Sequence, residues 1–401
     1  MYPLIFLLWS GLFYDAPPFP EVLPAPDAFA EEERELLLDF MNITNEAGLS
    51  NSQKICETLP RFKTEKSFRA HPMHWPGVTW EKKDGIYRVV QIVWGDADLI
   101  GTLDLRAFSA LRFLFVFKHD ADCTRSSKPG GSQPEEEFRL LLPENSRLEV
   151  LVCDNAGLFR LDLDGQTQLR HLSCEGDPIR HFDLSHLSKL EYFSCRNCPA
   201  ESVRFASPPM ELRSLSLSGE CCSPKAIYAM KKLQNFCWQT ESALPSDLLR
   251  HLSGCKELEF HRVSSQMLDL SQNHDLVFLT LTDLPALTVL DLRDSEKLEY
   301  LEITDCPKLR RIILPAALHP DRCSEDEVPL WPELENTSVE EIEFSDGTKL
   351  SLEEFLENPD WLEDDWLEDE GLEDEGLEGE GLEDEGLEVD ANVLEDSESR
   401  E

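Results

Sequence analysis

Paired cysteines and histidines are the residues of this sequence whose types and spacing could bind a metal ion. Cys195-x-x-Cys198 has the separation of half a structural zinc site, which needs a second pair to complete a tetrahedral shell. No second pair follows at zinc spacing, so we expect no metal there. His71-x-x-His74 lies in a proline-bounded loop and lacks the helix that a zinc peptidase motif requires, so we expect surface histidines.

Aspartates that recur at a fixed place in a repeated pattern are the other candidates for chemistry. They are Asp162, Asp183, Asp269 and Asp291. Recurrence indicates a structural role, because catalysis needs one constellation of residues and not many copies. No glycine-rich phosphate loop and no nucleophile elbow is present. We therefore predict a protein that is not an enzyme and that binds no cofactor and no metal.

The elements that position these residues are internal repeats. Leu148-Glu-Val-Leu-Val-Cys, Leu169-Arg-His-Leu-Ser-Cys and Leu190-Glu-Tyr-Phe-Ser-Cys start 21 residues apart. Further copies begin at Val89, Leu111, Leu212, Leu233, Cys255, Leu276 and Leu298. A period of this length is typical of a solenoid, and we expect roughly ten turns.

Each copy has the alternation of a strand, in which every second residue points into the core. Cys153, Cys174 and Cys195 share one position, which Leu217, Phe260, Leu281 and Ile303 take in other copies. We therefore expect a buried structural ladder of thiols that behave as small hydrophobic groups. A chain of 401 residues has an ample core and no need of disulfides.

The segment from Leu148 to Leu163 is very similar to the 21-residue leucine-rich repeat of bacteria, in which a cysteine ladder replaces one leucine column. Such repeats occur in some internalins and in surface proteins of clostridia and spirochaetes. The resemblance implies an α/β leucine-rich-repeat solenoid, with a curved parallel sheet and an extended or 3₁₀ outer face. Scaffolds of this type mostly bind proteins or glycans.

One column departs from the family pattern. The asparagine of the repeat is kept at Asn155, whereas we place the following residues at the matching position of other copies: Asp177, Cys198, Gly219, Asp283 and Asp305. This difference indicates a diverged member without a continuous side-chain ladder along that edge.

The rest of the chain divides around the repeats. We expect an apolar segment and Pro-rich linker at 1–27, an N-terminal cap at 28–88, the repeats at 89–314, a C-terminal cap at 315–357 and an acidic tail at 358–401. A polar insertion loop interrupts the repeats at 118–137. Short helices are expected at 31–42, 224–232 and 245–252, and a hairpin with an Asp346-Gly347 turn at 339–352.

The chain is strongly acidic, with a formal net charge of −43. From Glu357 to Glu401 there are 22 acidic residues against one arginine, a net of −21. This charge disfavours nucleic acid and anionic membranes as partners. The five-residue repeat of the tail builds no apolar stripe on a helix, so we expect disorder there.

The apolar run from Met1 to Tyr14 is too short to span a bilayer, so we expect no membrane insertion. It resembles the core of a signal peptide without its charged start. A secreted or cell-surface protein, a misassigned start and a segment packed on the body are all open. We expect a secreted or surface location, with the cytoplasm as the alternative.

Residues flanking the central leucine of each strand should point to the concave face and carry function. The candidate ligand-binding residues are Phe113, Phe115, His171, Tyr192, Asn235, Glu257, Phe278 and Tyr300. Exposed aromatic groups concentrate binding energy, so we predict a non-enzymatic protein that binds a protein or glycan ligand on this face. The alternative is an intracellular acidic scaffold whose tail captures basic proteins.

Overall fold

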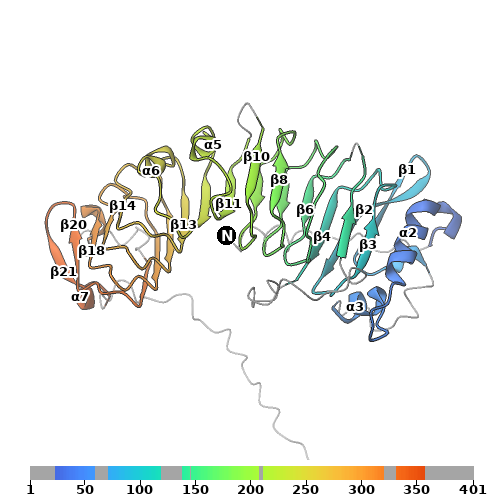
Figure 1. Ribbon diagram of the computed structural model, residues 1–401, viewed down its shortest axis with the longest axis horizontal. Coiled ribbons are helices and arrows are strands. Elements are labelled where there is room, and N and C mark those ends of the chain that lie inside the picture. The colour runs from blue at the N-terminus through green and yellow to red at the C-terminus, as the bar shows by residue number, and fades with distance from the viewer. Residues whose placement is uncertain are drawn as a thin grey trace, which may run out of the picture. The chain divides into compact units, whose positions relative to one another are not determined.

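The computed structural model describes residues 23–58, 71–118, 138–144, 146–206, 211–319 and 331–356. Within these residues the chain is a parallel β-solenoid of about nine turns with little helix, which confirms the predicted fold class. Figure 1 shows the strands side by side along the solenoid. The segment 1–22, nearly all of the predicted insertion loop at 118–137, and the predicted acidic tail lie outside the described residues.

One strand of each repeat joins a long sheet of twelve strands. All of its neighbouring strands run parallel except the β1–β2 pair. Its strands, in order, are β1 (Val78–Lys83), β2 (Ile86–Gly95), β4 (Phe113–Phe117), β6 (Val150–Val152), β7 (His171–Ser173), β9 (Tyr192–Ser194), β11 (Ser214–Ser218), β12 (Asn235–Gln239), β13 (Glu257–His261), β15 (Phe278–Thr282), β17 (Tyr300–Thr304) and β19 (Trp331–Glu335). Every predicted repeat from Val89 to Leu298 contributes one of these strands.

The second strand of many repeats joins one of three shorter sheets on the other side of the core. These strands are β3 (Gly101–Asp104) with β5 (Phe138–Leu141), β8 (His181–Leu184) with β10 (Ser202–Phe205), and β14 (Met267–Asp269), β16 (Val289–Asp291), β18 (Arg311–Leu314), β20 (Glu341–Phe344) and β21 (Lys349–Ser351). Residues of both layers share one buried hydrophobic cluster. The core therefore runs along the whole solenoid between the layers.

The 21-residue period produces this fold because it puts equivalent residues in register. Leu151 pairs with Leu172, and Leu172 pairs with Phe193, so one apolar column is fully buried. Burial of each such side chain contributes about 1.5–3 kcal/mol. No repeat can bury its apolar face alone, so each turn depends on its neighbours.

Cys153, Cys174 and Cys195 lie in a second inward column and are fully buried. The Sγ atoms of Cys153 and Cys174 lie 3.4 Å apart, without a disulfide bond. The Cys195 thiol donates to the carbonyl oxygen of Ser216, at 3.7 Å. These thiols pack as small apolar groups and bond weakly to the backbone of the next turn.

The asparagine column that we expected is in fact two adjacent columns. Residues of the first column form the turn after each strand. Their backbone φ is near +60°, a value that asparagine, aspartate and glycine adopt most readily. Members of this column include Asn155, Gly176, Asn197, Gly219, Asp283 and Asp305. Asp177 and Cys198 belong to the second column, which is buried. Our assignment of both residues to the Asn155 position was wrong by one residue.

In this second column, the side chain of Asp177 bonds to the backbone of the preceding turn, as the members of a side-chain ladder do. Its Oδ1 atom accepts hydrogen bonds from the backbone of the preceding turn, from Gly157 N at 2.7 Å and Leu158 N at 3.1 Å. The Cys198 thiol likewise donates to the carbonyl oxygen of Cys174, at 2.8 Å. Neighbouring turns are therefore joined by hydrogen bonds on this edge even where asparagine is missing.

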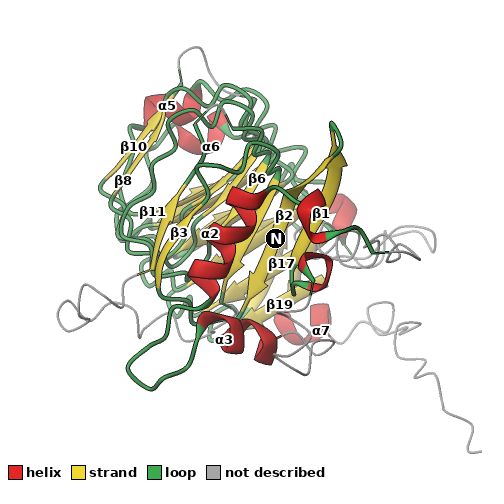
Figure 2. Cartoon of the chain, turned by 90° about the vertical axis from the view of Figure 1, so that its right-hand side faces the viewer, coloured by secondary structure: helices red, strands yellow, loops and turns green. Residues whose placement is uncertain are grey.

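Two helices and a hairpin cover the first turn of the solenoid. Helix α2 (Glu31–Met41) confirms the predicted helix, and α3 (Asn51–Thr58) follows it. Figure 2 shows both helices at the β1–β2 end of the long sheet. Phe40 of α2 stacks on Trp94 of β2, and Asn51 of α3 donates to the carbonyl oxygens of Phe40 and Ile100.

The segment that we predicted as a C-terminal cap contributes strands to both layers. Strand β19 pairs in parallel with β17, and β20 pairs in parallel with β18. Strands β20 and β21 form the predicted hairpin, and α7 (Leu352–Leu356) follows. The predicted short helices of the outer layer are also present, as α5 (Pro224–Tyr228) and α6 (Leu248–His251).

Candidate ligand-binding face

The long sheet has one face toward the core and one away from it, which is the concave face of the predicted solenoid. Strand register arranges its side chains in rows that cross the strands. The first row contains Gln91, Phe113, Val150, His171, Tyr192, Ser214, Asn235, Glu257, Phe278 and Tyr300. Seven of the eight predicted binding residues therefore share one row, and Phe115 lies in the next.

Aromatic side chains of the first row meet in pairs. The rings of His171 and Tyr192 stack with their centroids 3.9 Å apart and their planes at 2°. Phe278 and Tyr300 lie 6.4 Å apart at a tilt of 47°. Phe278 is 45% exposed, the most open of the predicted binding residues. Burial lowers the pKa of His171 to about 4, so its ring is neutral at neutral pH.

One polar pair of the first row bonds along the row, and an arginine beside the row covers one of its aromatic rings. The amide of Asn235 donates to the carboxylate of Glu257. The guanidinium of Arg112 lies over the ring of Phe113, 4.9 Å from its centroid. Both Phe113 and Glu257 are partly buried. The row therefore combines aromatic and polar groups on a regular sheet.

The second row lies two residues further along each strand and is more buried than we expected. Phe115 is only 5% exposed, because it packs with Val93, Phe117 and Val152 in an apolar cluster on the concave face. Side chains in register on neighbouring parallel strands lie about 4.8 Å apart, close enough for large groups to cover one another. Phe115 is therefore a packing residue, and the expectation that it is exposed was wrong.

A third row, two residues beyond the second, was missed in the sequence. It includes Asp154, Glu175, Arg196, Ser218, Gln239 and His261. Continuing the strand alternation past the short β6, β7 and β9 would have found its first three members. This row contains charged side chains of both signs, and it bonds to polar residues of the second row.

Buried serines of the second row hold the acidic members of the third. Ser173 Oγ donates to Asp154 at 2.6 Å, and Ser194 Oγ donates to Glu175 at 2.5 Å. Burial, and then the charge of Glu175, raises the pKa of Asp154 well above its usual value.

A compact cluster of polar and charged side chains lies on β12 and β13, with Arg196 beside it. The Arg196 guanidinium lies 3.0 Å from Glu259 Oε2, and His261 Nε2 lies 3.5 Å from the same oxygen. Burial opposes the ionisation of Glu259, but the hydrogen bond of His261 and the charge of Arg196 outweigh it and lower its pKa below its usual value. Cys237 is fully buried beside them, and its thiol, the Glu259 carboxylate and the His261 ring nitrogen lie within 4.8 Å of one another.

The pairs that first suggested metal chemistry have structural roles instead. Cys195 and Cys198 are buried, and both thiols donate to backbone carbonyls. His71 is also buried, contrary to our expectation of surface histidines. Its Nδ1 accepts from Met73 N and its Nε2 lies 2.7 Å from the carbonyl oxygen of Pro24.

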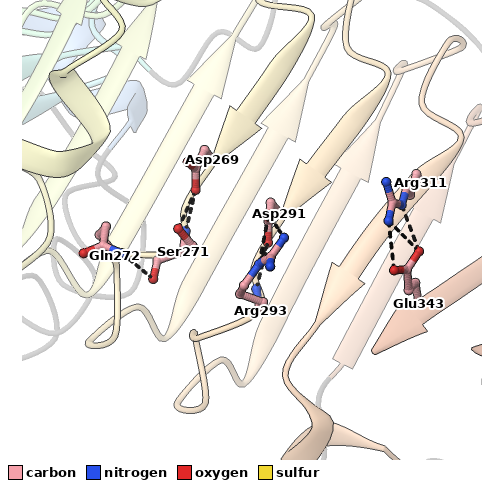
Figure 3. A network of polar contacts seen from close by, with 7 residues as sticks. All are labelled: Asp269, Ser271, Gln272, Asp291, Arg293, Arg311 and Glu343. Carbon is pink, nitrogen blue, oxygen red and sulfur yellow. Dashed lines mark hydrogen bonds and ion pairs between the residues drawn. The ribbon is translucent and has the colours of Figure 1, made fainter. Parts of the chain in front are cut away.

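The recurring aspartates form turns, which confirms their predicted structural role. The carboxylates of Asp162, Asp183, Asp269 and Asp291 each accept the backbone N–H two residues later, at 3.0–3.2 Å. Figure 3 shows two of these turns, where Asp269 accepts from Ser271 and Asp291 from Arg293. An aspartate side chain that bonds its own backbone in this way stabilises a tight turn.

A polar groove of about 770 Å³ lies at one edge of the long sheet, beside the first row. Its lining residues include Lys82, Lys83, Arg112, Arg147 and Arg170 as well as Glu81 and Glu149. Arg112 pairs with Glu149 at 2.9 Å. The groove is thus mainly basic, although the chain as a whole is strongly acidic.

None of the described helices is long and apolar enough to span a membrane.

No family model and no curated protein matches this sequence. Among solved structures, the functional domain of InlJ from Listeria monocytogenes, whose structure includes a cysteine ladder, is 13% identical with a TM-score of 0.36. The match covers 63% of this chain and 64% of that one, so this chain spans less than two thirds of the InlJ domain.

Two further structures show likeness at similar levels. Internalin InlF from Listeria monocytogenes is 14% identical with a TM-score of 0.33, over 64% of this chain and 79% of that one. The ectodomain of the Arabidopsis thaliana receptor kinase GASSHO1/SCHENGEN3, in complex with CASPARIAN STRIP INTEGRITY FACTOR 2, is 13% identical with a TM-score of 0.34. That match covers 77% of this chain and 41% of the ectodomain. The parallel strand pairing of this chain establishes its solenoid fold.

Proposed function

We propose that this chain is a non-enzymatic binding protein that recognises a protein or glycan ligand along the first row of the concave face. The observation that carries the proposal is the row of partly exposed aromatic groups, in which His171 stacks on Tyr192 and Phe278 lies beside Tyr300. Aromatic side chains offer large contact areas at a low cost in conformational entropy. The hydrogen-bonded sheet holds them in place before a ligand arrives.

The same row suits either ligand class by its composition. Aromatic faces pack on apolar side chains and on sugar rings, while Asn235 and Glu257 offer hydrogen-bond groups between them. Several adjacent strands present these groups together, which favours an extended ligand lying across the strands. The recurring aspartates form turns away from this row and take no part in binding.

The experiment begins with a photo-crosslinking amino acid at Phe278, the most exposed aromatic group of the row. The captured ligand is identified by mass spectrometry and its affinity is measured for the wild type and for alanine variants. Phe278→Ala and Tyr300→Ala should each weaken binding about 30-fold or more, which is a loss of about 2 kcal/mol.

Matched controls come from exposed apolar residues outside the row. Phe159 is 53% exposed and Met267, on β14 of the second layer, is 58% exposed. Phe159→Ala and Met267→Ala should leave binding unchanged. Unchanged binding by alanine variants of Phe113, Tyr192, Phe278 and Tyr300 would disprove the assignment of the ligand to this row.

We further propose a secreted or cell-surface location, which is supported by the resemblance of the first 14 residues to a signal-peptide core. The alternative is an intracellular scaffold whose acidic C-terminal segment, net −21, captures basic proteins. Cell fractionation with N-terminal sequencing tests the location. Deletion of 362–401 tests the scaffold, which requires a loss of salt-sensitive binding to basic partners.

A further inference from the structure

We propose that Cys237, Glu259 and His261 form a binding site for one divalent transition-metal ion of the zinc type on the concave face. The three donors are a thiol sulfur, a carboxylate oxygen and an imidazole nitrogen, all within 4.8 Å of one another. Among the described residues, these three are the group of cysteine, histidine and acidic side chains whose ligand atoms lie close enough together to hold an ion. The inference is independent of the protein or glycan ligand proposed above.

The parallel register of β12 and β13 creates this cluster. Cys237 pairs directly with Glu259, so their side chains are neighbours on one face of the sheet. His261 lies two residues after Glu259 on the same strand, and side chains two residues apart point to the same face. All three donors are therefore fixed by regular strands, which lose little freedom when an ion binds.

The distances are close to those of a tetrahedral site. Bonds of about 2.0–2.3 Å at tetrahedral angles place neighbouring donor atoms about 3.3–3.8 Å apart. His261 Nε2 and Glu259 Oε2 are 3.5 Å apart, which is already within this range. The remaining separations, at most 4.8 Å, need side-chain adjustments of about 1 Å.

Donor type indicates which metal is preferred. A thiolate and an imidazole select zinc, cobalt or nickel over calcium or magnesium, which prefer oxygen ligands. The Cys237 thiol releases its proton to solvent as the metal–sulfur bond forms. The thiolate and the Glu259 carboxylate then balance the double positive charge, and the neutral His261 completes a set of three protein ligands with a fourth position open.

The cluster is buried but open to solvent on one side, and a positively charged side chain lies beside it. Cys237 is fully buried and Glu259 is 7% exposed, while the His261 side chain is 20% exposed and leaves an approach from solvent. Arg196, 3.0 Å from Glu259, supplies the positive charge that the buried carboxylate needs when no ion is bound. An arriving ion replaces Arg196 at Glu259 Oε2, so Arg196 is its competitor.

The test uses the purified full-length chain, stripped with a chelator and titrated with Co²⁺ alone and with Zn²⁺ alone. Cobalt should give a thiolate-to-metal charge-transfer band and the visible spectrum of a tetrahedral complex, saturating at one equivalent. Cys237→Ser should abolish the charge-transfer band. His261→Gln, at the partly exposed position, should weaken Zn²⁺ binding by at least about 10-fold, because loss of a direct ligand costs no less than loss of a group that supports one.

Matched controls replace residues of the same types outside the cluster. Cys306→Ser removes a buried thiol, and His251→Gln removes an exposed imidazole. Both should keep the band and the affinity of the wild type, and circular dichroism should show that every variant is folded. If Cys237→Ser does not fold, His261→Gln decides the question.

Two outcomes would overturn the proposal. A wild-type protein without the charge-transfer band has no thiolate site, and binding that survives in both Cys237→Ser and His261→Gln belongs to other carboxylates or thiols. Arg196→Gln should also tighten Zn²⁺ binding, because it removes the competing cation. A failure of tightening would contradict the position assigned to the ion.

Discussion

Replacing Asp177 by alanine should destabilise the solenoid more than any change to the exposed aspartates. The carboxylate is fully buried, and its Oδ1 accepts the backbone N–H groups of Gly157 and Leu158 in the preceding turn. Alanine leaves both donors buried without a partner, at about 1–3 kcal/mol each. We expect Asp177→Ala to lower the free energy of unfolding by about 2–4 kcal/mol.

Asp177→Asn separates the hydrogen bonds from the charge. Asparagine keeps an acceptor oxygen at the Oδ1 position and has nearly the same shape. Burial, more than any other influence, raises the pKa of Asp177 well above its usual value of 3.8, so ionisation in the folded state is unfavourable. Asp177→Asn should therefore be as stable as the wild type at low pH and more stable at high pH.

The sign of this pH dependence follows from proton linkage. Above about pH 4 the unfolded state has released the Asp177 proton, whereas the folded state still holds it. The contribution of this group to stability is thus greatest at low pH and falls as the pH rises toward the folded pKa. In the Asp177→Asn variant this part of the slope should be missing.

Urea unfolding followed by circular dichroism at pH 5 and pH 8 measures both effects. Asp162→Ala is the matched control, because Asp162 is exposed and accepts one backbone N–H within its own turn, at 3.0 Å. It should cost less than about 1 kcal/mol. If Asp177→Ala costs no more than Asp162→Ala, the inter-turn hydrogen bonds do not stabilise the solenoid and the reasoning fails.

Two further predictions concern packing and backbone conformation. Leu172→Ala, in the fully buried leucine column, should cost about 2–5 kcal/mol in urea unfolding, and a loss below 1 kcal/mol would mean that the turns repack. Gly77→Ala should be strongly destabilising, since φ is +70° and an added Cβ would lie 2.1 Å from the carbonyl oxygen of Val93. Its control Gly254→Ala, with nothing within 4 Å, should change the melting temperature little.

The repeats could be predicted from the sequence because the signal is redundant. Ten copies starting between Val89 and Leu298 each gave a strand of the long sheet, and the helix at 31–42 and the hairpin at 339–352 were also found. A buried column imposes its residue type at every turn, so an error in one copy is corrected by the others. The turn columns were harder to align from the sequence. Asn155 and Asp177 belong to adjacent columns, one residue apart in the repeat, and both are polar, so the pattern did not separate them.

The candidate face was predicted only in part. Strand alternation placed Phe113, Tyr192, Phe278 and Tyr300 in one row, as the register shows. It could not tell that Phe115 is covered by its neighbours, because coverage depends on residues from adjacent strands about 20 or more positions away. Alternation identifies a face, but only packing determines which residues of that face are accessible.

The solenoid, its period and its inward columns follow from the residue pattern, because they depend on local spacing repeated many times. Which side chains from different turns meet depends instead on how the strands are arranged in the folded chain. Cys237, Glu259 and His261 show no motif in the sequence, since the first is 22 residues from the second, and the register of two parallel strands makes them neighbours. Arg196 lies 63 residues from Glu259 in the sequence and still bonds to it. Strand β9, which Arg196 follows, is only three strands away from β13 in the long sheet.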